Sequence, residues 1–228
     1  MTVDALGEFS NHPHNTGHGF IINKTGFKSP GTHRVEGDWS GAAFMLCAGA
    51  LTESGIEVTG LNPNSRQGDK KTVEILRQFG ADVKQTVNGF VSKTGNLNGI
   101  EIDAGDIPDL IPILSVAAAA ANGTTHIYNA ARLRIKESDR LAAVSDMLTA
   151  LGAQVEEGED SLTIHGGRRL HGGSVNGVND HRIVMSAAVA SIISDGAVTV
   201  TDAEAISKSY PEFWSDFNKC GAEIYKEQ

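Results

Sequence analysis

The chain has 228 residues, of which 40% are hydrophobic and 21% are charged, and its formal net charge is −9. This composition is ordinary for a soluble globular protein. Because an acidic chain with few aromatic residues binds the nucleic-acid backbone poorly, we expect no nucleic-acid partner and consider small anions instead.

The sequence predicts neither a membrane span nor a disulfide framework. The longest apolar stretch, around LIPILSVAAAAA, is too short and too rich in alanine to cross a bilayer. The first residues, MTVDALGEFSNHPH, have an early acid and no apolar core, unlike a signal peptide. Cys47 and Cys220 lie far apart, which fits free thiols in a reducing compartment rather than a zinc site. We therefore expect a cytoplasmic protein with no membrane partner.

The first 35 residues are interpreted as the end of a broken repeat. TVDALGEFS is predicted to form a helix, and GFIINKTG the strand that follows it. HPHNTGH, between them, is interpreted as a loop and not as a set of metal ligands. Pro30 and Gly31 indicate a linker. We therefore predict that residues 1–35 are a partial repeat from a domain other than that of residues 36–228.

Three copies of one unit follow, at about residues 36–104, 105–172 and 173–228. Each starts with an apolar helix, in SGAAFMLCAGALTES, DLIPILSVAAAAAN and DHRIVMSAAVASIISD. A glycine and a strand come next, in GIEVTGL, GTTHIYN and GAVTVTD. An amphipathic helix, a Gly-Ala turn and a strand follow, in VEILRQFGADV, VSDMLTALGAQV and FWSDFNKCGAEI. VSKTG and SLTIHGG add a further strand to the first two copies.

This repeat predicts an α/β fold with pseudo-threefold symmetry and one shared core. The first helix of each unit is apolar nearly all round, so we expect it to be buried. Polar residues collect just before each first helix, in VEGDWS, DIPDL and VNDHR, and just before each second helix, in NSRQGDKK, RIKESDR and ISKSYPEF. Helix N-termini suit anions because they carry free N–H groups and the positive end of the helix dipole. If symmetry brings these termini to one face, an anion site is expected there.

Ordinary structural roles compete with an anion site at these positions. Helix capping, worth about 1 kcal/mol per residue, is one such role, and the candidate caps are Asp38, Ser40, Asp109 and Asp180. Glu137 and Arg140 are three residues apart and can form a surface pair worth about 0.3 kcal/mol. However, Arg140, Arg182 and Lys208 stand near predicted helix N-termini, where a cation opposes the dipole. Their placement favours a ligand anion.

Seven motifs run in order along the chain: VEGDWSGAAF, VTGLNPNSRQGD, DIPDLIPIL, RIKESDRLA, LGAQVEEGED, NDHRIVMSAA and KSYPEFW. In this order the chain resembles the C-terminal half of the 5-enolpyruvylshikimate-3-phosphate synthase family, the 3-phosphoshikimate 1-carboxyvinyltransferases. The combination of KESDR, NDHR and KSYP is highly specific, and the resemblance covers essentially the whole chain. It implies an inside-out α/β barrel of βαβαββ units, the enolpyruvyl transferase fold, in a two-domain enzyme with its active site between the domains.

The resemblance also implies a reaction. The family transfers the enolpyruvyl group of phosphoenolpyruvate to the 5-hydroxyl of shikimate 3-phosphate and releases phosphate, in the shikimate pathway of aromatic amino acid biosynthesis. It uses no metal and no organic cofactor, and its members are usually monomeric. A full member is about twice as long, so the implied partner is the missing N-terminal half, and we expect the chain alone to be inactive.

The family match assigns two catalytic residues. Asp109 matches an acid/base aspartate that also contacts the shikimate ring hydroxyls, and Glu137 matches a second acid/base near the enolpyruvyl group. One departure is visible: some members have Asn, contacting shikimate 3-phosphate, where this chain has Arg132. Arg132 is therefore left outside the predicted site.

Five further residues match substrate-binding positions of the family. Arg140 and Arg182 match arginines that hold phosphoenolpyruvate, which suits a planar guanidinium facing carboxylate or phosphate. Lys208 matches a lysine on the same ligand. Lys136 matches a lysine on the shikimate phosphate side, and His181 matches a supporting histidine.

Within RIKESDR, Ser138 and Asp139 are expected to cap the helix, and Arg134 to belong to an ordinary solvated face. Two other functions stay open at this point. One is a related enolpyruvyl transferase that acts on UDP-N-acetylglucosamine. The other is a folded fragment without turnover.

Overall fold

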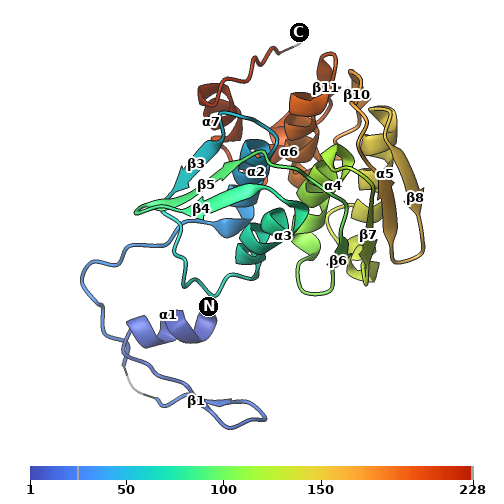
Figure 1. Ribbon diagram of the computed structural model, residues 1–228. Coiled ribbons are helices and arrows are strands. Elements are labelled where there is room, and N and C mark those ends of the chain that lie inside the picture. Colours follow the sequence, from blue (N-terminus) through green and yellow to red (C-terminus); the bar gives the residue numbers. More distant parts are fainter. Residues whose placement is uncertain (25, 227–228) are drawn as a thin grey trace.

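The computed structural model describes residues 1–24 and 26–226 of the chain (Figure 1). Thr25, within the predicted N-terminal strand, and residues 227–228, at the end of the predicted second domain, lie outside the described residues. The helices in the described part are α1 (Thr2–Glu8), α2 (Trp39–Ala50), α3 (Thr72–Phe79), α4 (Ile111–Ala120), α5 (Arg140–Ala150), α6 (His181–Ala190) and α7 (Phe213–Lys219). No helix there has the length and apolar character needed to cross a membrane.

The three first helices of the repeat, α2, α4 and α6, pack against one another in the centre of the molecule (Figure 1). Almost every residue of each is buried, as the apolar, alanine-rich sequences predict. Asp38 caps α2 through the amides of Ser40 and Gly41, and Asp180 caps α6 through the amide of Arg182. Thus α2 and α6 start at an aspartate cap, whereas α4 has no side-chain cap and the cap expected of Asp109 is not formed.

The strands form separate sheets outside these central helices. The strands are β3 (Ile56–Thr59), β4 (Asp82–Gln85), β5 (Gly89–Lys93), β6 (Glu101–Asp103), β7 (Thr124–Tyr128), β8 (Gln154–Glu157), β9 (Leu162–His165), β10 (Gly173–Val175) and β11 (Val198–Val200). The sheet orders are β3-β5-β4, β6-β7-β9-β8 and β10-β11. Pairs β6–β7 and β10–β11 are parallel, whereas the other pairs are antiparallel. The three helices α2, α4 and α6 thus lie inside, and the sheets lie outside them.

The complete βαβαββ order runs through β6, α4, β7, α5, β8 and β9, and its first strand, β6, lies just before the boundary predicted at about residue 105. The alternating burial of β7 and β9 puts Ile127, Leu162 and Ile164 into the core. The second helices contribute one face each, as in α7, where Phe213 and Phe217 are buried. Phe213 contacts Phe44 of α2 edge to face, which ties the outer helix to the centre.

The third copy differs from the prediction after α7. A strand was expected in the Ala-Glu-Ile segment after Gly221, but residues 222–226 form no strand. In the other copies, β4 and β8 pair with β5 and β9, the strands that come after them in the chain. Among the described residues the third copy has no counterpart of β5 or β9. Residues 222–226 therefore lack the neighbour that their hydrogen bonds require, and the prediction is wrong here.

Residues 1–24 contain α1 and a small hairpin of β1 (His14–Asn15) and β2 (Phe20–Ile21), which lie apart from the rest in Figure 1. The helix in TVDALGEFS is confirmed, but the strand expected over GFIINKTG is only two residues long. HPHNTGH enters this hairpin instead of forming a plain loop. Residues 26–38 contain neither helix nor strand. The division at residue 35 into two domains remains a prediction.

Candidate active site

Five of the seven predicted site residues meet at the N-terminal ends of the helices. Asp109 lies in the 3₁₀ turn Pro108–Leu110 that leads into α4, and Arg182 is the second residue of α6. Lys136 and Glu137 precede α5, and Arg140 is its first residue. Three segments of the sequence are thereby brought to one place by the packing of α4, α5 and α6.

Arg140 is the centre of this cluster, and its side chain is 0% exposed. Its Nε donates to Asp180 Oδ2 at 2.8 Å, and its Nη1 donates to Asp109 Oδ1 at 2.6 Å. Its Nη2 donates to Glu137 Oε2. Glu137 and Arg140 do pair, but not as the surface pair that their spacing allows, because the guanidinium is buried. A buried cation held by three carboxylates is instead a local concentration of charge.

Asp109 is surrounded by three cations. Besides Arg140, Lys136 Nζ lies 3.0 Å from its Oδ1 and Arg182 Nη2 lies 3.9 Å from its Oδ2. Burial alone would raise the pKa of Asp109, but Arg182, Lys136 and Arg140 together lower it below its usual value. Asp109 is therefore ionised at neutral pH, and about a third of its side chain is exposed to solvent.

Arg182 is held by two different helices. Its Nη1 donates to the backbone oxygen of Asp109 at 2.9 Å, and its Nη2 donates to Ser40 Oγ at 2.6 Å. Its Nε is buried and has no hydrogen-bond partner in the described part of the chain. The unpaired N–H of this arginine can donate to a further anionic oxygen.

His181 and Lys208 are near the cluster but bond to different groups. His181 is buried, and its Nδ1 lies 3.9 Å from Asp180 Oδ1. Burial and the neighbouring Arg182 lower the pKa of His181, so the imidazole is neutral at pH 7. Lys208, at the end of the 3₁₀ turn Ala203–Lys208, donates to the backbone oxygen of Asn179 and to its Oδ1 at 2.8 Å. Lys208 thus reaches the cluster only through the residue before Asp180.

Asp180 is the residue whose role the sequence did not reveal. Asp180 caps α6, as one interpretation of the sequence predicts. Its carboxylate also accepts from Nε and Nη2 of Arg140. Burial would raise its pKa, yet the hydrogen bond and charge of Arg140 lower it. Its side chain is fully buried. The sequence shows only that Asp180 stands at a helix N-terminus next to Arg182. It does not show the ion pair with Arg140, which lies 40 residues earlier in the chain.

The other capping predictions have mixed outcomes. Asp139 caps α5 by accepting from the amide of Ala142 at 3.1 Å, as expected. The cap expected of Ser138 is wrong, because its hydroxyl donates to Asp180 Oδ2 at 2.9 Å. Arg134 has the ordinary surface role expected of it and forms ion pairs with Asp139 and Glu157. The motif therefore divides between surface pairing, capping and the buried cluster.

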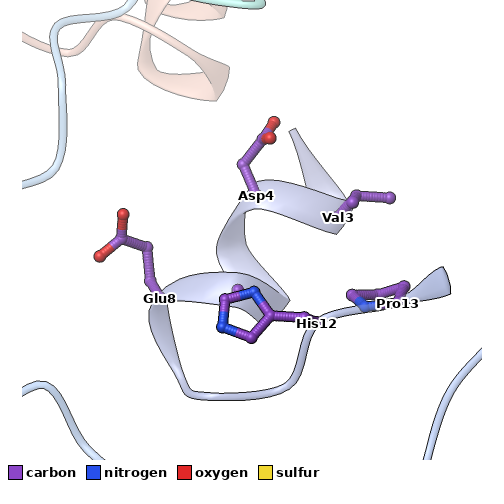
Figure 2. A pocket seen from close by; sticks show the side chains of 6 residues that line it. Val3, Asp4, Glu8, His12 and Pro13 are labelled. Atoms are coloured by element: carbon purple, nitrogen blue, oxygen red, sulfur yellow. The ribbon is translucent and has the colours of Figure 1, made fainter.

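Arg132 lies outside the cluster. Its Nη1 donates to the backbone oxygen of Gly105 at 3.1 Å. In the described part of the chain no group of three or more His, Cys, Asp or Glu residues is arranged to hold a metal ion. A shallow pocket beside α1 is lined by Asp4, Glu8 and His12 (Figure 2), and it belongs to the N-terminal segment and not to the helix N-termini.

The cluster can support two kinds of chemistry. Arg140, Arg182 and Lys136 supply positive charge that suits a small anion with several oxygens. Asp109 and Glu137 are carboxylates beside these cations, and each is partly exposed and so open to a substrate. Cations next to ionised carboxylates allow an anion to be bound and a proton to be moved in one place.

The comparisons with known proteins point the same way. Residues 1–217 match the family model described as EPSP synthase (3-phosphoshikimate 1-carboxyvinyltransferase). The chain is 46% identical over 227 residues to a 3-phosphoshikimate 1-carboxyvinyltransferase of Clostridium acetobutylicum, covering 99% of this chain and 52% of that protein. It is 36% identical to that of Methanocaldococcus jannaschii, covering 98% and 52%. The chain spans about half the length of these curated relatives.

Solved structures show the same fold. EPSP synthase from Acinetobacter baumannii superposes with a TM-score of 0.85 at 30% identity, covering 98% of this chain and 54% of that one. The enolpyruvyl transferase NikO from Streptomyces tendae gives a TM-score of 0.76 at 20% identity, with 98% and 52% coverage. The second likeness concerns the fold alone. The α/β fold with interior helices is therefore the enolpyruvyl transferase fold.

Proposed function

Because the chain belongs to the EPSP synthase (3-phosphoshikimate 1-carboxyvinyltransferase) family, we propose that it forms about half of an enzyme with that activity. The enzyme transfers the enolpyruvyl group of phosphoenolpyruvate to the 5-hydroxyl of shikimate 3-phosphate and releases phosphate. The observation that carries this proposal is the meeting of Lys136, Arg140 and Arg182 around Asp109. A cluster of cations beside an ionised carboxylate suits a phosphorylated carboxylic acid that must react with a hydroxyl.

In this proposal Arg182 and Arg140 bind the carboxylate and phosphate of phosphoenolpyruvate. Arg182 has an unused buried Nε, which supports a direct contact. Arg140 already donates to Asp109, Glu137 and Asp180, so an incoming anion has to displace one of these carboxylates from it. Asp180 is fully buried and stays in place, whereas Asp109 and Glu137 are partly exposed. Ligand binding thus frees an acid/base carboxylate next to the bound anion.

Asp109 is proposed to take the hydroxyl proton, and Glu137 to act at the methylene carbon of the enolpyruvyl group. Neighbouring cations lower the pKa of Asp109, which keeps it ionised but makes it a weak base. The negative charge of bound phosphoenolpyruvate offsets those cations, so the pKa of Asp109 rises when the ligand is present. A base positioned in this way contributes about 10²–10⁴-fold to a rate.

Lys136, Lys208 and His181 have supporting roles in the proposal. Lys136 helps to keep Asp109 ionised by lowering its pKa, and it contacts the phosphate side of shikimate 3-phosphate. Lys208 is ordered by Asn179 and turns to phosphoenolpyruvate when the ligand is bound. His181 is neutral and buried, which avoids adding a fourth full positive charge beside Arg182. The remaining substrate contacts and closure of the site are assigned to the part of the relatives that this chain does not span.

Titration of the 228-residue chain with phosphoenolpyruvate, followed by NMR, tests the anion site. We expect weak binding with shifts at Arg140, Arg182 and Lys208, because water is not excluded from a half site. Absence of shifts at millimolar ligand would contradict the proposal. Phosphate release with both substrates is the second assay, and we expect no turnover by this chain alone. A chain with robust turnover would refute the need for a second half.

A further inference from the structure

Two residues outside the assigned site, Ser40 and Asp69, lie near Arg182, and Ser40 hydrogen-bonds it directly. Ser40 is the second residue of α2, Arg182 is the second residue of α6, and Asp109 is the second residue of the turn before α4. Ser40 and Arg182 thus occupy equivalent positions in two copies of the repeat, and Asp109 lies just before the corresponding helix of the third. Ser40 Oγ accepts from Arg182 Nη2 at 2.6 Å, and the Asp109 backbone oxygen accepts from Arg182 Nη1 at 2.9 Å. The two Nη atoms of Arg182, in the third copy of the repeat, are therefore held by the first and the second copy.

Asp69 stands behind Ser40. It lies three residues before α3, as Glu137 lies three residues before α5, so it is the counterpart of a predicted acid/base residue in another copy. Its carboxylate is partly buried, and the Ser40 hydroxyl is one of the groups that act to lower its pKa. Since Ser40 Oγ accepts from Arg182, its own hydrogen is free to be donated to Asp69.

Helix capping does not explain the Ser40 hydroxyl. Asp38 already caps α2, with Oδ1 accepting from the amide of Ser40 at 3.1 Å and Oδ2 from the amide of Gly41 at 2.7 Å. Nor is Asp69 a simple surface carboxylate, because burial raises its pKa above the usual value, although Ser40 and the charge of Arg182 act in the opposite direction. A partly buried carboxylate is costly in free energy, and its place close to Ser40 and Arg182 calls for a role in the site.

We propose that Ser40 and Asp69 are positioning residues that hold the guanidinium of Arg182 in the orientation that binds phosphoenolpyruvate. Asp69 fixes the rotation of the Ser40 hydroxyl, so that a lone pair of Ser40 always faces Arg182. The bound orientation of Arg182 then exists before the ligand arrives, and less rotational freedom is lost on binding. The inference rests on the proposed function, in which Arg182 contacts the ligand.

The positioning is tested without ligand, on the ¹⁵N-arginine-labelled 228-residue chain. The two Nη groups of Arg182 give separate NMR signals if rotation about the Cζ–Nε bond is slow, and Arg182→Lys assigns them. We expect Ser40→Ala and Asp69→Asn to speed this rotation by about tenfold or more, the factor that corresponds to about 1.4 kcal/mol. Ser40→Thr retains the hydroxyl and is expected to restore slow rotation.

A double variant identifies the order of contacts. If Asp69 acts only through Ser40, then Asp69→Asn adds no further effect in the Ser40→Ala chain. Additive effects would overturn the relay, as would unchanged Arg182 rotation in Ser40→Ala. Asp82→Asn, an exposed carboxylate of β4 with its own partner Lys84, is the matched control and is expected to leave Arg182 unchanged. Amide spectra and melting curves of each variant verify that it is folded.

Ligand binding is measured separately, with phosphoenolpyruvate and with inorganic phosphate as probes. We expect Ser40→Ala to weaken phosphoenolpyruvate binding about tenfold, by the same conversion. Equal affinity for the unaltered and Ser40→Ala chains would overturn the proposal. If the unaltered chain binds neither probe, the proposed function is contradicted, whereas the arginine rotation still decides whether Ser40 and Asp69 position Arg182. The two failures are thus distinguishable.

Discussion

Replacing Asp180 by Asn tests the buried centre of the site. Asn is also a good helix N-cap, so the start of α6 is preserved while the negative charge beside Arg140 is lost. Removing one partner of a buried ion pair costs about 3–5 kcal/mol, because an uncompensated charge stays buried. Arg140 keeps Asp109 and Glu137 as partners, so we expect the lower end, about 3 kcal/mol. For a chain of this size that loss lowers Tm by about 6–12 °C.

The assay is unfolding in urea, followed by circular dichroism, with a thermal melt as the second measurement. Asp139→Asn is the matched control, because Asp139 caps α5 but holds only the partly exposed Arg134. We expect its cost to stay below about 1 kcal/mol. The acid limb gives an independent check. The pKa of Asp180 is lowered by folding, so its contribution is complete above about pH 5 and is lost as the pH falls through the unfolded value of about 3.9 and below.

A shallower loss of stability in acid is therefore expected for Asp180→Asn than for the unaltered chain. Equal costs for Asp180→Asn and Asp139→Asn, both near or below about 1 kcal/mol, would refute the reasoning. Arg140 would then be stabilised without Asp180, and the buried pair would contribute no more than a surface one. Restored stability in an Arg140→Met, Asp180→Asn double variant would support it, because the stranded charge is removed.

Three further predictions concern other parts of the molecule. His181 is expected to titrate below about 6.5, because burial and Arg182 lower its pKa, and an NMR titration measures this. The free energy of unfolding is expected to fall as the pH drops below that value, since only the unfolded chain takes up the proton. Gly80→Ala is expected to lower the free energy of unfolding in urea more than Gly221→Ala does. Both glycines have φ above +100°, a conformation that costs alanine about 1–2 kcal/mol. Only at Gly80 does the new methyl group also meet a backbone atom, the carbonyl oxygen of Asn96. Amides of β11 are expected to exchange with deuterium faster than those of β7, because β7 has neighbours on both sides and β11, in the described chain, only β10; equal protection would contradict this.

Much of the architecture follows from local patterns. The central helices are apolar on every side, so burial was the only favourable place for them, and the Gly-Ala turns mark where the outer helices end. Gly80 has φ of +106° and Gly221 has φ of +102°, a conformation that glycine adopts at little cost. The prediction of a strand after Gly221 was wrong because pairing between strands is not a local property. A strand is stable only with a neighbour, and the composition of residues 222–226 carries no information about one.

By itself the sequence determined the repeat, the buried helices and the charged residues available at their N-termini, because periodicity and helix-end chemistry are local properties. The family resemblance supplied the candidate roles of Asp109, Glu137, Arg140 and Arg182. Only the tertiary structure decided which of these groups touch. Asp180 holds an arginine 40 positions earlier in the chain, and Ser40 meets Arg182 across 142 positions. Such pairings depend on how three copies of the repeat pack around one centre, and no stretch of sequence contains both partners.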